Sequence, residues 1–176
     1  MKIFKKLFFA VLCFYNVSIF SVHSSETPYF IDFKYILNES DAGKKAQNFL
    51  KKKLEKGIAD IKKSEQEISS EEKKIIQQKK LISPEEYKKK VAELRKKVSE
   101  LQKKRSKLLD SVAKQRNFAR NELLKNLNPI IKDYMNKNKV RMVLDKKSLL
   151  LADENLDITK EIMAVLNKNL KSIKLN

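Results

Sequence analysis

The sequence predicts an α+β fold in which a small β-containing body carries a long antiparallel coiled-coil helical hairpin. Residues 44–138 are nearly all helix formers, and Ser83-Pro84 is their one obvious break. Apolar residues recur every seven positions on both sides of that break, which is typical of helices packed in a coiled coil. Short apolar runs outside this region have the alternation and β-branched content of strands. With 176 residues, the chain has room for one modest domain.

The heptad positions define how the two helices pair. They are Ile82, Ile75, Ile68 and Ile61 before the break, and Tyr87, Leu94, Leu101 and Leu108 after it. Taken in this order, the residue numbers of each opposed pair add to one constant, as an antiparallel hairpin requires. A second layer places Ile58 opposite Val112. The sequence therefore predicts one closed seam between the two helices.

The break at residues 83–84 has the composition of a tight reversal. Pro84 disfavours helical geometry in the residue before it and is well suited to the first position of a new helix. Ser83 can cap that helix, and Glu86 completes a Ser-x-x-Glu capping box. We expect the tip of the hairpin here.

Two positions interrupt the apolar seam. Glu65 and Arg105 occupy opposed positions at one level, so we expect an ion pair worth roughly 0 to 1 kcal/mol that fixes the register. The alternative is that both side chains extend into solvent. Gly57 lies near the root of the first helix, where it is either a flexing point or a tolerated helical glycine.

The first 24 residues have the features of a cleaved secretory signal peptide. Lys2, Lys5 and Lys6 precede an apolar run over residues 7–20, and small residues follow near position 24. A signal anchor is the competing interpretation, although the run is short for a spanning helix. Cleavage would remove Cys13 and His23, the only cysteine and the only histidine.

The mature chain would therefore lack the residues for disulfide, zinc or His-dependent nucleophilic chemistry. With Gly43 and Gly57 as its only glycines, it also has no Gly-rich phosphate loop. We expect no catalytic residue, no cofactor and no metal, and an enzyme is the least expected class of protein.

Residues 25–43 and 126–176 are predicted to form the body, and residues 44–125 the arm. Strands are expected at residues 29–33, 140–145 and 149–152, with a hairpin loop at 145–148 and one helical turn at 34–37. Residues 38–41 would cap the descending helix near Ala42. Asp157 would cap a last helix whose inward side chains are Ile158, Ile162, Val165 or Leu166, and Leu170.

The returning helix should enter the body along a widened apolar stripe that runs from Phe118 to Tyr134. Pro129 should kink it, and residues 136–139 should end it, with an Asn that can take the left-handed conformation. Such a body is too small to bury a self-sufficient core, and its strand edges invite partner chains. We therefore expect an obligate oligomer with a shared β core. Its contact residues would be Tyr29, Ile31, Phe33, Val140, Met142, Leu144 and Leu150.

Positive charge dominates the distal arm. The formal net charge is +18, and residues 73–107 hold fourteen Lys or Arg against four Asp or Glu. A solvated surface needs charge but not one sign of charge, so we expect the arm to attract acidic polypeptides and anionic lipid by long-range fields. The residues assigned to this surface are Lys73, Lys74, Lys79, Lys80, Lys88, Lys89, Lys90, Arg95, Lys96, Lys97, Lys103 and Lys104.

The mature chain resembles the Skp (OmpH) family of periplasmic chaperones. The resemblance is carried by Tyr29 to Phe33 with Glu39-Ser40-Asp41-Ala42-Gly43-Lys44, by Asn128-Pro129-Ile130 through Val140-Arg141-Met142-Val143-Leu144-Asp145, and by Leu156-Asp157-Ile158-Thr159 through Leu166-Asn167-Lys168. It implies a periplasmic homotrimer whose arms enclose a cavity. That cavity would hold unfolded outer-membrane β-barrel proteins without ATP, and a lipopolysaccharide or anionic lipid surface is a further partner.

Two other classes of function fit parts of the pattern. A basic, lysine-rich chain suggests nucleic-acid binding, but export and the lack of interleaved aromatic residues argue against it. A periplasmic coiled-coil adaptor or spacer would use the same rigid hairpin to bind one folded partner stoichiometrically. A chaperone would instead suppress the aggregation of many unfolded β-barrels.

Overall fold

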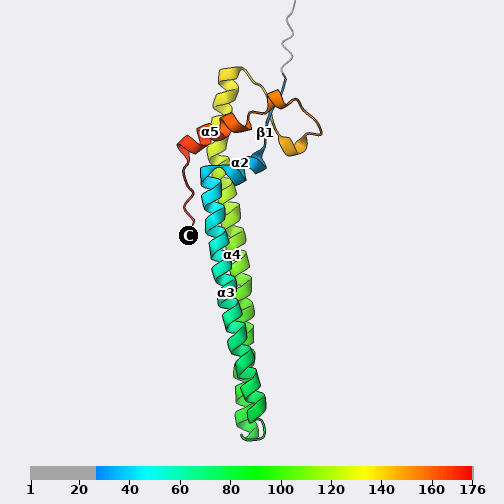
Figure 1. Ribbon diagram of the computed structural model, residues 1–176, viewed down its shortest axis with the longest axis vertical. Coiled ribbons are helices and arrows are strands. Elements are labelled where there is room, and N and C mark those ends of the chain that lie inside the picture. The colour runs from blue at the N-terminus through cyan, green and yellow to red at the C-terminus, as the bar shows by residue number, and fades with distance from the viewer. Residues whose placement is uncertain (1–26, 176) are drawn as a thin grey trace, which may run out of the picture.

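The computed structural model describes residues 27–175, so the expected signal peptide lies outside the described residues. The elements run in the order β1 (Tyr29–Ile31), α2 (Phe33–Glu39), α3 (Asp41–Gln78), α4 (Pro84–Asn138), β2 (Val143–Asp145), two 3₁₀ turns (Lys146–Ser148 and Glu154–Leu156) and α5 (Thr159–Asn169). Figure 1 shows α3 and most of α4 side by side as a long arm, which projects from a body formed by the end of α4 and the other elements. The predicted α+β class with a helical hairpin arm is confirmed.

Serine side chains begin both helices of the arm. Ser40 Oγ accepts a hydrogen bond from Gly43 N–H at 3.2 Å, and Ser83 Oγ accepts one from Glu86 N–H at 3.2 Å. The Glu86 carboxylate lies 3.7 Å from Lys90 Nζ, one turn further along α4. Both caps fall where the sequence predicted them.

The descending helix ends earlier than expected. α3 stops at Gln78, and the chain then makes tight turns in which Lys79 N–H donates to Ile76 O and Leu81 N–H donates to Gln78 O. Ile82 therefore lies in the reversal, not on the helix. Closing a reversal between two packed helices needs several non-helical residues, and Pro84 supplies only the last constraint.

The predicted register holds along the middle and outer arm. Ile68 and Leu101 line one shallow groove between the helices, and Ile75 and Leu94 line another. Near the root the pattern changes, because Ile58 is 53% exposed and so is not the seam residue expected there. A straight helix drifts by about 20° per heptad from a 3.5-residue repeat, so such a shift accumulates along a long arm.

At that level Gly57 takes the inward position. A Cβ atom there would lie 2.5 Å from the Leu108 methyl groups, and α3 continues as regular helix through the glycine. Close packing against Leu108 therefore explains the glycine better than a flexing point does.

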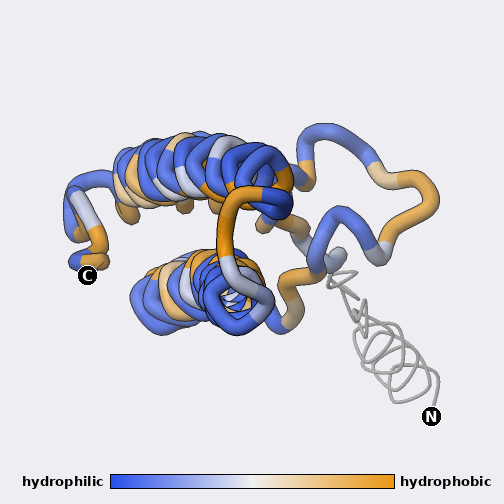
Figure 2. The backbone as a smooth tube through the Cα atoms, turned by 90° about the horizontal axis from the view of Figure 1, so that it is seen from below, coloured by the Kyte–Doolittle hydropathy of each residue, from blue (hydrophilic) through white to orange (hydrophobic). Residues whose placement is uncertain are grey.

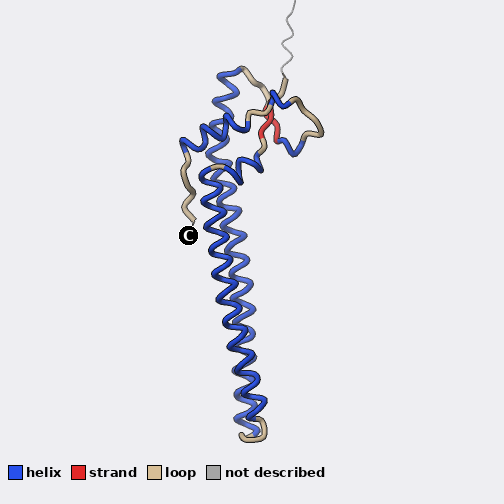
Figure 3. Tube along the Cα trace, in the orientation of Figure 1, coloured by secondary structure: helices blue, strands red, loops and turns tan. Residues whose placement is uncertain are grey.

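The sheet has two strands, and they are parallel. Tyr29, Phe30 and Ile31 pair with Val143, Leu144 and Asp145. On the other side of β1, Phe30 O accepts from Ile158 N–H at 3.0 Å, as part of an isolated bridge to Asp157. Figure 3 shows this small sheet at the base of the arm. The predicted hairpin between residues 140–145 and 149–152 is wrong.

Two of the three predicted strands are shortened and one does not form. β1 ends at Ile31 because Asp32 caps α2, its Oδ1 accepting from Tyr35 N–H at 2.7 Å. Only residues 143–145 of the second run form a strand. Residues 149–152 have no sheet partner in the described chain, because the 3₁₀ turn at Lys146–Ser148 carries them away from β2.

The end of α4 also differs in detail from the prediction. α4 runs through Pro129 to Asn138, and Lys139, not an Asn, takes the left-handed conformation at φ 54°. Val140 N–H then donates to Met135 O at 2.9 Å, which satisfies a carbonyl at the helix end.

The body buries a core of its own, made mainly by helices. Ile36 of α2, Leu123 and Leu127 of α4, and Ile162 and Leu166 of α5 are almost fully buried. One chain therefore has a buried core within its body, because α2 and the inner part of α4 supply apolar surface that a count of strands omits. Phe118 and Val165 remain 49% and 43% exposed and do not join this core.

The start of α5 differs by one residue from the prediction, because Ile158 and not Asp157 is the N-cap and it makes no side-chain cap bond. Asp157 Oδ1 accepts from Thr159 N–H at 2.9 Å, and the Thr159 hydroxyl accepts from Asp32 N–H at 2.7 Å. The second bond connects α5 to the end of β1 through the Thr159 side chain.

Candidate functional site

The arm carries almost all of the net positive charge that remains after residue 24. Residues 44–125 contain 26 Lys or Arg and 12 Asp or Glu, a net charge of +14. Residues 25–43 and 126–176 together hold eleven basic and ten acidic residues. The field of the molecule is therefore concentrated on α3, α4 and the turn between them.

The twelve basic residues assigned from the sequence all lie on this arm, and all are exposed except the half-buried Lys90. Three of them contact neighbours across the hairpin. Lys90 Nζ donates to Gln78 Oε1 at 3.0 Å, Lys97 Nζ contacts Glu71 Oε2 at 2.6 Å, and Lys79 Nζ lies 5.8 Å from the centre of the Tyr87 ring. These three side chains tie α3 to α4 as well as adding charge.

The expected ion pair between Glu65 and Arg105 is present. The Arg105 guanidinium donates to the Glu65 carboxylate from the opposite helix, and both side chains are 44% exposed. Nearer the tip, the Glu71 carboxylate pairs with Lys97 of the opposite helix. This hydrogen bond raises the pKa of Lys97 above the ordinary value for lysine. Ion pairs thus bridge the two helices along the middle of the arm.

Apolar side chains are interspersed with the lysines on the outside of the arm. Ile76, Val98 and Leu109 are 60%, 41% and 56% exposed, and Leu81 at the tip is 82% exposed. Ile76 and Val98 line one open groove of about 440 Å³ together with Arg95. Seen from the tip, both helices are mainly hydrophilic outside, and apolar colour reappears at the turn (Figure 2). The surface combines dispersed apolar contacts with a strong positive field.

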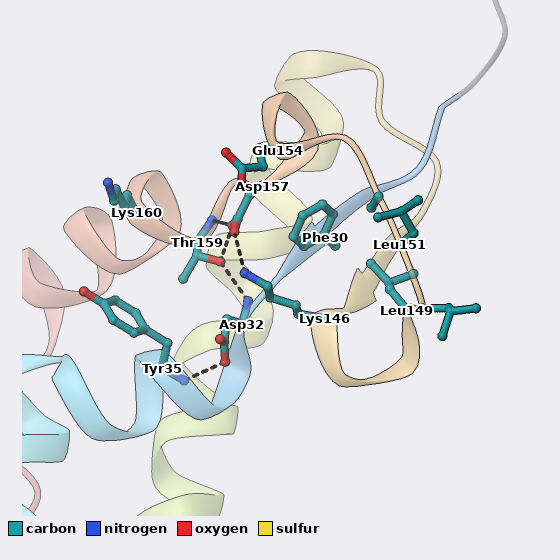
Figure 4. Close-up of a pocket in the computed structure, with 12 residues that line it drawn as sticks. Phe30, Asp32, Tyr35, Lys146, Leu149, Leu151, Glu154, Asp157, Thr159 and Lys160 are labelled. Atoms are coloured by element: carbon teal, nitrogen blue, oxygen red, sulfur yellow. Dashed lines mark hydrogen bonds and ion pairs between the residues drawn. The ribbon is translucent and has the colours of Figure 1, made fainter.

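A second candidate region lies on the body beside β1. Lys146 Nζ lies 5.9 Å from the centre of the Phe30 ring and 3.7 Å from Asp157 Oδ2. These contacts hold Lys146 in one wall of an open cavity of about 590 Å³. The opposite wall is the unpaired segment that contains Leu149 and Leu151 (Figure 4).

The residues assigned to oligomer contacts divide into three groups by exposure. Ile31 and Val140 are buried at 6% and 9% exposure within their own chain, so they are not available to a partner. Tyr29, Phe33 and Leu144 are half-buried. Met142 is 55% exposed, and Leu150 is fully exposed, as is most of its neighbour Leu151.

Sequence reasoning missed a basic groove at the root of the arm. It lies where α2 meets α3 and α4, and its cations include Lys51 and Arg116. The signal was a set of cations beside small or apolar residues at helical spacing. Runs of basic residues are more frequent on the outer arm, and Arg116 in the groove has no immediate basic neighbour in the sequence.

Two other types of site, a metal-binding cluster and a membrane-spanning helix, are absent from residues 27–175. No group of three or more Asp, Glu, His or Cys side chains in this part of the chain could hold a metal ion. No helix among the same residues is long and apolar enough to cross a membrane.

Two comparisons with known proteins found similarities to this chain. Residues 29–166 match the family model described as outer membrane protein (OmpH-like). Among solved structures, the chain is similar to a candidate outer membrane chaperone (OmpH-like) from Caulobacter crescentus CB15. The TM-score is 0.77 at 21% identity, over 85% of this chain and 90% of that one. A search of curated proteins finds no match.

Proposed function

Because this chain belongs to the OmpH-like family of outer membrane proteins, we propose that it is an ATP-independent periplasmic holdase chaperone. It captures unfolded outer-membrane β-barrel proteins between its basic arms and prevents their aggregation. The fold that it shares with the candidate chaperone of Caulobacter crescentus supports this proposal.

The observation that carries the proposal is the surface of the arm. A net charge of +14 on residues 44–125 draws in acidic polypeptide, and exposed Ile76, Val98 and Leu109 offer weak apolar contacts once it arrives. Many weak contacts acting together hold a flexible chain without requiring one fixed binding pose. Such a surface suits clients that share no folded structure.

A cavity requires several arms, so the proposed assembly is a homotrimer. The body offers the edge of β2 and the exposed Met142, Leu150 and Leu151 as contact surface. Exposed leucines beside an open strand edge are features that proteins usually cover. The proposed assembly buries them between the bodies, which leaves the arms separate.

The proposed location is the periplasm, reached through cleavage of the signal peptide at residues 1–24. At the membrane surface, the same lysines would attract anionic lipid or lipopolysaccharide head groups. Both clients and lipids would then be recognised by sign of charge and not by sequence.

The alternative is a coiled-coil adaptor that spans a distance in the cell envelope. The unbroken α3 and α4 helices and their cross-helix ion pairs favour this second function, since a spacer must be stiff. An adaptor would bind one folded partner at fixed stoichiometry and would leave the aggregation of unfolded barrels unchanged.

The deciding experiment is light scattering from a urea-denatured outer-membrane porin diluted into buffer with and without the mature protein, in the absence of nucleotide. We expect the protein to suppress scattering. The rate of capture should fall as salt rises, because the Debye length shrinks from ~10 Å at 0.1 M to ~3 Å at 1 M. Unchanged scattering would contradict the holdase function, and capture that ignores salt would contradict attraction by the arm.

A matched pair of variants separates the arm from total charge. Replacing Lys88, Lys89, Lys96 and Lys103 by Gln removes four exposed cations from the arm. The control replaces four exposed body cations, Lys132, Lys137, Lys168 and Lys174, by Gln. Only the arm variant should capture the porin more slowly. Equal slowing in both would indicate a general effect of net charge.

A further inference from the structure

The groove at the root of the arm has a lining unlike that of the outer arm. It has a volume of about 590 Å³ and is formed by residues of α2, α3 and α4. Its floor is apolar, with the buried Leu50, Ala119 and Leu123 and the half-buried Leu54 and Val112. The volume falls in the range of ~300 to 1,000 Å³ that is typical of ligand sites.

The rim of this groove carries only positive charge. Lys34, Lys51, Arg116 and Arg120 line it, and no Asp or Glu is among the lining residues. Arg120 is oriented by the Phe33 ring, with its guanidinium carbon 5.6 Å from the ring centre. Lys51 is 3.9 Å from Glu55, which lies outside the groove. A ligand that combines apolar groups with negative charge is complementary to this lining.

Carboxamides on the rim indicate the kind of ligand. Asn38, Gln47, Asn48 and Asn117 line the groove, and Gln47 Nε2 donates to Asn38 Oδ1 at 2.7 Å. A carboxamide both donates and accepts hydrogen bonds. An extended polypeptide presents alternating N–H and C=O groups to such side chains, whereas an acyl chain presents neither. The lining therefore favours a peptide over a lipid.

We propose that the root groove binds a short extended segment of an unfolded polypeptide in which apolar side chains alternate with Asp or Glu. The apolar side chains lie on the floor, and the carboxylates face the four cations. This inference rests on the proposed holdase function and deepens it, because it gives a client one preferred contact beside the weak contacts of the outer arm.

The test uses the mature protein and a fluorescein-labelled peptide in which Asp alternates with Leu and Tyr. Fluorescence anisotropy measures its dissociation constant at 0.1 M salt. A second peptide has Asn in place of every Asp, and we expect it to bind at least tenfold more weakly. Vesicles of phosphatidylglycerol, added as competitor, test whether a lipid takes the groove in preference to the peptide.

Two variants of equal charge locate the binding. Lys34→Glu with Arg116→Glu changes the rim at two exposed positions, and Lys132→Glu with Lys137→Glu changes exposed positions on α4 outside the groove. Circular dichroism and mass in solution check that both variants keep the fold and assembly. We expect the rim variant to bind the Asp peptide about tenfold more weakly than the α4 control, a difference of about 1.4 kcal/mol.

Three results would overturn the proposal: no binding by the wild-type protein, equal weakening in both variants, or complete displacement of the peptide by vesicles. Porin light scattering on the same samples separates this inference from the function on which it rests. Full suppression of scattering without peptide binding contradicts the groove alone. Peptide binding without suppression contradicts the holdase function alone.

Discussion

Glu65 and Arg105 meet across the hairpin from helices that are forty residues apart in sequence at this level. Each side chain is a little under half exposed, so solvent screens the attraction and the pair contributes little to stability. Its geometric effect is larger, because a slip of one residue would separate the charges and leave both beside the apolar seam. The pair is better described as selecting one register than as strengthening the arm.

A double-mutant cycle tests this pair. We expect Glu65→Ala and Arg105→Ala to show a coupling free energy of about 0.5 kcal/mol in urea unfolding at low salt, and less at 1 M salt. A cycle on Glu71 and Lys97, the neighbouring contact at 2.6 Å, provides the comparison. Coupling of zero in the Glu65 cycle would mean that the two side chains act independently.

The contact between Glu65 and Arg105 could be predicted from the sequence for a simple reason. The spacing of Ile61, Ile68 and Ile75 determined the register of the opposed helix, and the position of a charged pair followed from it. Ile58 was misplaced because the pairing of the outer arm was extended to the root, where the helices have drifted. The root groove was not predicted because it needs α2 beside the hairpin, which no periodicity within α3 or α4 encodes.

The corner between α2 and α3 depends on the absence of a side chain at one position. Gly43 is buried, and a Cβ atom there would lie 2.1 Å from the Leu37 carbonyl oxygen. A backbone carbonyl cannot rotate away as a side chain can. The corner directs α3 away from the body, so this glycine positions the start of the arm.

Replacing this glycine should be costly. We expect Gly43→Ala to lower the free energy of unfolding by about 1 to 3 kcal/mol, as overpacking typically does. Gly57→Ala is the matched control, because its obstacle is the flexible end of Leu108 and alanine gains about 1 kcal/mol of helix propensity. Urea unfolding measures both, and a larger loss for Gly57→Ala would contradict this account.

At the level of elements, long helices were predictable and short strands were not. The helices follow from many repeated positions, and their caps follow from Ser40 and Ser83. A strand of three residues has too few positions for alternation to distinguish it from a loop. Residues 149–152 have the composition of a strand, yet the preceding 3₁₀ turn directs them away from β2. Their apolar content is explained by the proposed contact between chains.

For the molecule as a whole, the exposed leucines after β2 are the strongest indication of assembly. Leu150 is fully exposed and Leu151 is 91% exposed, on a body that already has its own core. Folding of one chain therefore does not account for them, whereas burial against partner bodies in the proposed trimer would. Each buried leucine would contribute about 1.5 to 3 kcal/mol per chain.

Analytical ultracentrifugation of the mature protein tests this assignment. We expect a trimer for the wild type and a predominantly monomeric species for Leu150→Asp with Leu151→Asp, which places charges in the contact. Leu81→Asp is the control, since Leu81 is similarly exposed but lies at the tip of the arm. An unchanged mass for the double variant would remove these leucines from the interface.

Because β1 and β2 are parallel, the whole helical hairpin lies within the crossover connection between them. Both feet of the hairpin are anchored in the body, one through α2 and the other through the end of α4. The arm can then be lengthened or shortened without changing its attachment to the body, provided that α3 and α4 change by the same number of whole heptads. Removing seven residues from each would shorten the reach by about 10 Å. The length of the arm, and with it the depth of the proposed cavity, can therefore vary while the body stays unchanged.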